Sequence, residues 1–170
     1  VLSRGTASCP DMESLSAAMD TLYGATVDSI VRKKGERQCI GFAASFIDDA
    51  FTPHGEKLLE PVAQLTGEML LDPVTRDGRF LTEYVDSEKA NLIDSIRALR
   101  NDKRDWADIR LMQEMCAAEP YSVLRLGDEA SAAALDAEML YRHERALLAS
   151  SRVEVLYCGS AEEQRVEDAV

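Results

Sequence analysis

The chain has 170 residues, of which 46% are hydrophobic and 29% charged, and 31 acidic residues against 19 basic ones give it a net charge of −12. These values are ordinary for a globular protein and exclude a disordered chain, and no apolar run approaches the roughly 20 residues of a membrane-spanning helix. The acidic balance also argues against nucleic acid and anionic membrane surfaces as partners, because both attract clustered lysines and arginines. We interpret the two basic stretches, residues 31–37 and 97–104, as a hairpin tip and a helix end.

The first residues, "VLSRGT", are typical of the last turn of a helix that ends on a glycine cap, Gly5. The stretch "SCPDMESLSAAMDTLYG" then predicts a helix over residues 10–23, because its apolar residues recur every three to four positions. Pro10 suits the first helical position and Gly24 the residue past the end.

Two β-rich runs follow, over residues 25–33 and 38–47, and the glycine in the "KKGE" between them predicts a β-hairpin. In the second run one face is bulky and the other is nearly bare; the bulky residues are Ile40, Phe42, Ala44 and Phe46, and the small ones are Cys39, Gly41, Ala43 and Ser45. Such a bare face is expected either under a tightly packed helix or beside another backbone.

The rest of the chain is mostly helical in pattern, and helices are predicted over residues 55–73, 80–103, 105–120 and 130–150. The run "RVEVLYCG" predicts one late strand over residues 152–159, followed by a last helix that begins in 160–170. A lone strand needs a partner for its edge groups, so we expect that strands are missing and that an N-terminal part precedes Val1. The order predicts an α+β fold, with an antiparallel or mixed sheet and long helices packed on one face.

Residues that could carry chemistry are few. There is no phosphate-binding glycine loop, no nucleophile elbow and no H-E-x-x-H or H-x-x-E-H motif. With only two histidines, His54 and His143, a self-contained zinc site would be hard to build, and each is predicted to lie at the surface or at an interface. The cysteines form no C-x-x-C pair, which favours small buried thiols in a reducing compartment and hence a cytoplasmic protein; they are Cys9, Cys39, Cys116 and Cys158.

Three acidic residues of the longest predicted helix are of more interest. Glu83 and Asp86 are three residues apart and share a face, whereas Glu88 lies further round the helix. A charged helix face is usually only solvated. A single inward carboxylate on such a helix could instead be one ligand of a metal whose other ligands lie elsewhere.

The order of "VLSRGT", an apolar helix, "LYGATVDS", a strand pair and "VDSEKANLIDSI" resembles the insulinase and mitochondrial processing peptidase family. Its catalytic members carry H-x-x-E-H on a helix that runs directly into a phrase like "MLFKGT". The resemblance therefore implies that the zinc histidines would fall before Val1. It also implies that the third zinc ligand would be Glu88 or Asp86.

Four further phrases resemble a bacterial subgroup of the family that lacks the zinc motif; they are "LYGA", "RKKGE", "NDKRDWADIRL" and "EMCAAEPY". The members of this subgroup look like non-catalytic partners and are typically encoded beside an active peptidase. Where catalytic members have an Asn-Ala-x-Thr-like phrase beside the metal, this chain has residues 28–31, Asp-Ser-Ile-Val. An extra carboxylate, Asp28, beside a metal-bound nucleophile would perturb its electrostatics, which further disfavours catalysis.

The resemblance implies that residues 1–170 form a single domain, a fragment of the N-terminal peptidase-like domain of a larger protein. We expect no catalytic residue, no cofactor and no bound metal in this chain, although catalytic relatives use zinc. The expected partner is a second peptidase-like domain or an active peptidase subunit, and an extended peptide could add to a strand edge. Two alternatives stay open: an active zinc peptidase whose H-x-x-E-H precedes Val1, and an unrelated α+β interaction domain.

Overall fold

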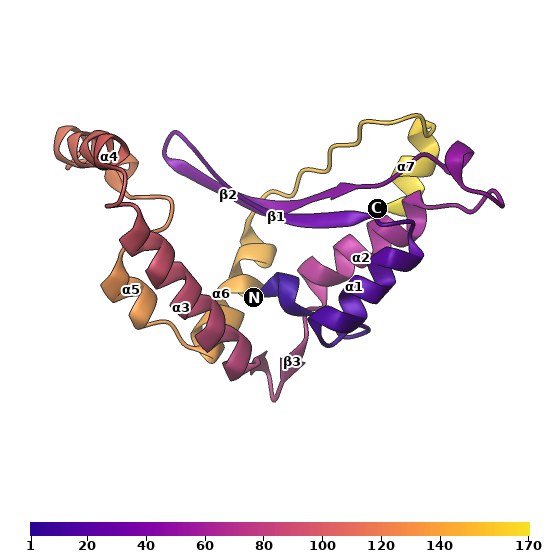
Figure 1. Cartoon of the computed structure of the whole chain (residues 1–170), viewed down its shortest axis with the longest axis horizontal. Coiled ribbons are helices and arrows are strands. Elements are labelled where there is room, and N and C mark those ends of the chain that lie inside the picture. Colours follow the sequence, from indigo (N-terminus) through magenta and orange to yellow (C-terminus); the bar gives the residue numbers. More distant parts are fainter.

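A long β-hairpin lies above a set of helices in the computed structural model, which describes all of residues 1–170 (Figure 1). This arrangement confirms the predicted α+β class with the main helices on one side of the hairpin. None of the helices combines the length and the apolar character needed to cross a bilayer. In chain order the elements are η1 (Leu2–Arg4), α1 (Met12–Thr21), β1 (Thr26–Lys34), β2 (Arg37–Ser45), η2 (Asp49–Phe51), α2 (Leu59–Leu71), β3 (Thr75–Arg76), β4 (Arg79–Phe80), α3 (Thr82–Ala98), α4 (Lys103–Met115), η3 (Pro120–Ser122), α5 (Glu129–Ala133), α6 (Ala137–Ser150) and α7 (Glu163–Ala169).

Side-chain caps set several helix boundaries. The Asp11 carboxylate accepts a hydrogen bond from the Ser14 backbone N–H at 2.8 Å and so begins α1, which leaves Pro10 one residue before the cap rather than at the first helical position. Asp136 accepts from the Met139 N–H at 2.7 Å in the same way. This cap starts a new helix, so the single helix predicted over 130–150 is in fact two, α5 and α6.

The predicted hairpin is confirmed. Lys34 pairs with Arg37, so Gly35 and Glu36 form a two-residue turn, and the φ of +61° at Gly35 fits the glycine-first type of hairpin turn. Val27 and Phe42 on its inner face pack against the helices. No helix covers the outer face of small residues; Cys39, Ala43 and Ser45 are exposed there.

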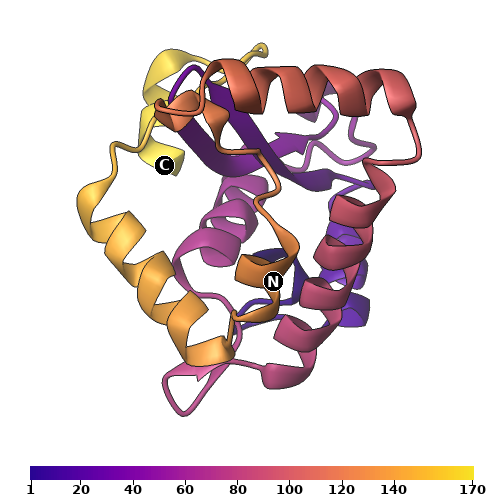
Figure 2. The ribbon, with the colours of Figure 1, turned by 90° about the vertical axis from the view of Figure 1, so that its left-hand side faces the viewer.

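The predicted strand over residues 152–159 is wrong. This run belongs to no sheet and makes no backbone–backbone hydrogen bond, and Leu156 is 92% exposed. It runs from α6 to α7 as an extended segment that Figure 1 draws along its length, and it lies at one side of the molecule in Figure 2. A β-branched sequence favours extended backbone, but a strand also requires a neighbouring chain to pair with, and no other element of the fold supplies one here.

Two small apolar clusters replace a single large core. One joins α1 and α2 to the hairpin through Leu15, Leu65 and Met69, and the other joins β4, α3 and α6 through Phe80, Val85 and Ala137. Only 16 of the 170 residues are buried, and the accessible surface is 11543 Å². A compact protein of 18.8 kDa exposes about 8,300 Å², so this fold is unusually open.

The four cysteines are all free thiols, and the expectation that they are small buried side chains is wrong for two of them. Cys39 and Cys158 are exposed, whereas Cys9 and Cys116 are half-buried.

Candidate functional site

An arginine of the "VLSRGT" phrase, Arg4, contacts Glu88, one of the two acidic candidates from the sequence. Arg4, at the end of η1, donates from Nε to Glu88 Oε1 at 2.6 Å and from Nη2 to Ser87 Oγ at 3.3 Å. The Glu88 side chain is 36% exposed, and its carboxylate points from α3 toward the start of the chain. The sequence left Glu88 and Asp86 as equal candidates, and the structure separates them.

The other acidic candidates of α3 face solvent. Asp86 is 58% exposed and pairs with Lys89 at 3.1 Å, one helical turn along α3. Glu83 is exposed as well. For these two carboxylates the solvated-face interpretation holds.

Gly5 holds Arg4 in place through a close backbone approach. Gly5 is the C-cap of η1, as predicted, but its φ of 162° is extended and not left-handed. A Cβ on Gly5 would lie 2.7 Å from the carbonyl carbon of Pro10 and 2.8 Å from the carbonyl oxygen of Cys9. The glycine is needed because only a hydrogen fits between these segments.

The next residue, Thr6, fastens the phrase to α2. It is fully buried, its Oγ1 accepts from the Cys9 N–H at 3.0 Å, and it donates to Glu68 Oε2 at 3.4 Å. Ser8 donates to the same carboxylate, and this bond, with another from Gln64, holds the pKa of Glu68 below its usual value. Residues 4–6 thus tie α2 and α3 together.

The residues around Glu88 do not fit a zinc ion. Zinc in catalytic sites takes three protein ligands from histidine, cysteine and carboxylate, but the carboxylate of Glu88 meets a guanidinium and a hydroxyl. The structure contains no group of three or more such side chains placed to hold a metal. His54, in the loop after η2, and His143, on α6, are both exposed, as predicted.

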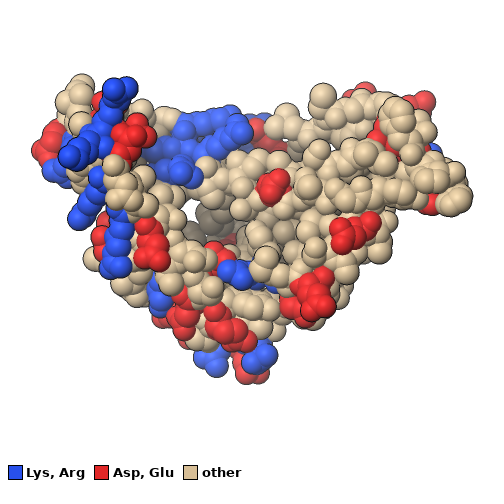
Figure 3. Space-filling view, in the orientation of Figure 1, with Lys and Arg blue, Asp and Glu red and all other residues tan.

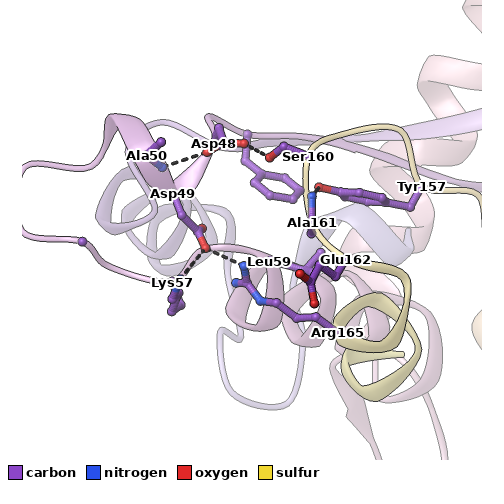
Figure 4. Close-up of a pocket in the computed structure, with 12 residues that line it drawn as sticks. Asp48, Asp49, Ala50, Lys57, Leu59, Tyr157, Ser160, Ala161, Glu162 and Arg165 are labelled. Carbon is purple, nitrogen blue, oxygen red and sulfur yellow. Dashed lines mark hydrogen bonds and ion pairs between the residues drawn. The ribbon is translucent and has the colours of Figure 1, made fainter.

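A second polar site lies where α7 meets α2 and η2, beside a recess of about 490 Å³ (Figure 4). Arg165 binds Glu60 through two parallel hydrogen bonds of 2.6 and 2.7 Å, and it reaches Asp49 Oδ2 at 2.6 Å. Asp48 caps η2 by accepting from the Ala50 N–H and also accepts from the Ser160 hydroxyl. Asp48 and Asp49 bond to residues 160 and 165 and so hold α7 in place, which gives this recess the character of a structural joint.

These contacts determine the protonation state of the Glu60 and Asp49 carboxylates. The hydrogen bonds from Arg165 lower the pKa of Glu60 to about 2. Partial burial would raise the pKa of Asp49, but hydrogen bonds from the Leu58 N–H and Arg165 outweigh it and leave that pKa below its usual value. Both carboxylates therefore stay charged and paired over the whole physiological range.

Other residues considered from the sequence lie apart from Glu88. Asp28 is on β1, exposed on the outer face opposite Ala43, and Cys116 is half-buried at the end of α4. Sequence reasoning missed Arg4 and Arg165 as the organising cations. Arg165 could have been noticed as the one base in the acidic stretch "SAEEQRVEDAV", whereas nothing local marks Arg4, whose partner is 84 residues away.

No protein-family model matches the chain. Over all 170 residues it is 31% identical to a probable inactive metalloprotease, YmfF, of Bacillus subtilis strain 168, and it spans 40% of that protein's length. Among solved structures, a conserved protein from Enterococcus faecalis V583 superposes with a TM-score of 0.81 at 23% identity, over 87% of this chain and 35% of that one. A peptidase M16 inactive domain from Pseudomonas fluorescens superposes with a TM-score of 0.62 at 16% identity, over 85% of this chain and 31% of that one. Both of these similarities are similarities of fold.

Proposed function

We propose that this chain, which belongs to the inactive subgroup of the insulinase-like (M16) metallopeptidases, is a non-catalytic domain that forms one wall of a peptidase-like assembly. Its partner in this proposal is a second peptidase-like domain or an active peptidase subunit. The chain would shape or support the space in which a peptide is held, without cutting it.

The contact between Arg4 and Glu88 carries the proposal. A carboxylate that is to bind zinc must offer its lone pairs to the ion, but those of Glu88 accept a charge-assisted hydrogen bond of 2.6 Å from a guanidinium. A divalent cation at the same carboxylate would also be repelled by the fixed positive charge of Arg4. One arginine therefore takes over both the charge balance and the geometry that a metal would otherwise supply.

The open surface supports an assembly role. The accessible area exceeds that of a compact protein of this mass by about 3,000 Å², about twice the roughly 1,600 Å² buried in a standard protein–protein interface. The hairpin has two strands only, so each strand leaves one edge unpaired, and an extended peptide or a strand of the partner could add to it.

Metal content tests the non-catalytic part of the proposal. Protein purified without chelator is expected to carry no zinc above background by elemental analysis, and EDTA is expected to leave its melting temperature unchanged. Arg4→Ala provides a matched variant, because freeing Glu88 still leaves one ligand where zinc needs three. Stoichiometric zinc that EDTA removes, or EDTA-sensitive cleavage of a fluorogenic peptide, would contradict the proposal.

Sedimentation velocity tests the assembly part. Mixing the chain with an active insulinase-like peptidase of the same organism is expected to give a faster-sedimenting complex. Two species that sediment independently at micromolar concentrations would count against a shared assembly.

A further inference from the structure

The two basic stretches, far apart in the sequence, are drawn to one end of the molecule. Lys33, near the tip of the hairpin, donates from Nζ to the carbonyl oxygens of Tyr121, at 2.5 Å, and Val123. Gln38 Nε2 donates to the carbonyl of Arg125 at 3.1 Å. The loop 120–125 that receives these bonds also packs against α4, and Figure 3 shows lysine and arginine side chains over the hairpin tip and the neighbouring helix.

Most of these cations have no acidic partner. Arg32, Lys34, Arg37 and Arg125 make no salt bridge, and neither do Lys103 and Arg104 at the start of α4. Unpaired positive charge gathered on one surface of an acidic protein marks a place where negative charge is attracted from outside.

The same surface is hollowed. A recess of about 190 Å³ lies between the hairpin tip and loop 120–125; its lining residues include Lys33, Glu36, Arg37, Gln38, Val123 and Arg125. Glu36 supplies its one carboxylate. Val123, 62% exposed, adds an apolar patch at the rim.

We propose that the hairpin tip and loop 120–125 form a docking site for an acidic segment of a partner polypeptide, with a carboxylate of that segment between Arg37 and Arg125. Guanidinium groups bind carboxylates in paired hydrogen bonds, so two arginines around one recess select for charge and for planar geometry. An apolar side chain next to the acid would cover Val123. The site does not use Arg4 or Glu88, so it stands whether or not the chain is catalytically inert.

The chemistry favours a short acidic polypeptide over a nucleic acid. A phosphate backbone continues beyond the patch onto the rest of the surface, which carries the excess of negative charge. Single strands also bind by stacking on free aromatic rings, but the ring of Tyr121 is already covered by the Lys33 ammonium, 4.8 Å from its centroid.

Fluorescence anisotropy with a labelled peptide tests the site. The probe is a ten-residue peptide that alternates glutamate and leucine, and the comparison probes are the same peptide with glutamine for glutamate and a ten-nucleotide oligo-dT. The acidic peptide is expected to bind, the glutamine peptide and the oligonucleotide to bind much more weakly, and the affinity to fall as salt is raised.

Matched charge reversals locate the binding. Arg37→Glu with Arg125→Glu is expected to weaken binding at least tenfold. The control pair, Arg76→Glu with Arg79→Glu in the exposed β3–β4 hairpin, changes the net charge equally and is expected to change the affinity less than about twofold. If the first pair unfolds the protein, Lys34→Glu alone, next to the turn, is expected to weaken binding several-fold.

Three results would overturn the proposal: equal losses from the two pairs, equal binding of the glutamine peptide, or tighter binding of oligo-dT than of the acidic peptide. The first would mean a diffuse field, the second an apolar surface, and the third a nucleic-acid site.

Discussion

Replacing Gly5 by alanine tests whether the close approach at "VLSRGT" holds the candidate site together. The new Cβ would stand 2.7 Å from the carbonyl carbon of Pro10, where contacts under 3.0 Å essentially never occur, and both neighbouring groups are backbone. The extended φ of Gly5 suits any residue, so the whole effect comes from the clash. Relief requires the segment after Thr6 to move by several tenths of an ångström, which strains the hydrogen bonds that Thr6 makes to Cys9 and Glu68.

Overpacking of this kind costs about 1–3 kcal/mol of unfolding free energy. In a protein of this length each kcal/mol lowers the melting temperature by about 2–4 °C, so Gly5→Ala is expected to lower it by about 2–12 °C. Urea and thermal unfolding followed by circular dichroism measure both quantities.

Gly67→Ala is the matched control. Gly67 lies inside α2, where a Cβ would meet nothing within 4 Å, so the alanine is expected to raise stability by about 0.5–1 kcal/mol through its better helix propensity. The reasoning is refuted if Gly5→Ala unfolds at the same urea concentration as the unchanged protein, or if the two alanine variants shift stability in the same direction.

Two further predictions concern the joint at α7 and the apolar core. Arg165 lowers the pKa of Glu60 from 4.5 to about 2, so the stability that this pair contributes is present above pH 4.5 and is lost as the pH falls toward 2. Hydrogen exchange of the α7 amides is therefore expected to become faster between pH 4.5 and 2. In Arg165→Met the exchange should be fast already at pH 7. If the exchange of α7 amides depends on pH in Arg165→Met as it does in the unchanged protein, this pair is not what holds α7. Met69, in the α1–α2 cluster, is 1% exposed, and Met69→Ala is expected to lower the free energy of unfolding measured in urea by about 2–5 kcal/mol. Met115, on α4, is 69% exposed, and Met115→Ala is expected to change that free energy by less than about 0.5 kcal/mol. Equal effects of the two methionine changes would mean that the cluster does not carry the stability of this half.

The helices were predictable because the signals that specify them are local. Apolar spacing indicated α1, α2, α3 and α4. The caps Asp11 and Asp136 are equally local, since each acts within three residues, but they were not recognised, and so the break between α5 and α6 was missed. The small β3–β4 hairpin was missed, although Asp77-Gly78, both at positive φ, is a turn signal that could have been read from the sequence.

The error at residues 152–159 has a different origin. Alternation and β-branching predict that this backbone is extended, which it is, but pairing depends on a second chain segment lying alongside. No property of the eight residues themselves contains that information, so propensity alone overstated the sheet.

By itself the sequence determined the α+β class, the positions of most helices, the hairpin and the resemblance to inactive metallopeptidase relatives. Tertiary structure alone decided that Glu88 rather than Asp86 faces the "VLSRGT" phrase, that Arg4 neutralises it, and that loop 120–125 meets the basic tip of the hairpin. The physical reason is range: helix periodicity, caps and turns act over a few residues, whereas Arg4 and Glu88 are 84 residues apart and Lys33 and Tyr121 are 88 apart. Only the packing of the elements brings such groups within hydrogen-bonding distance.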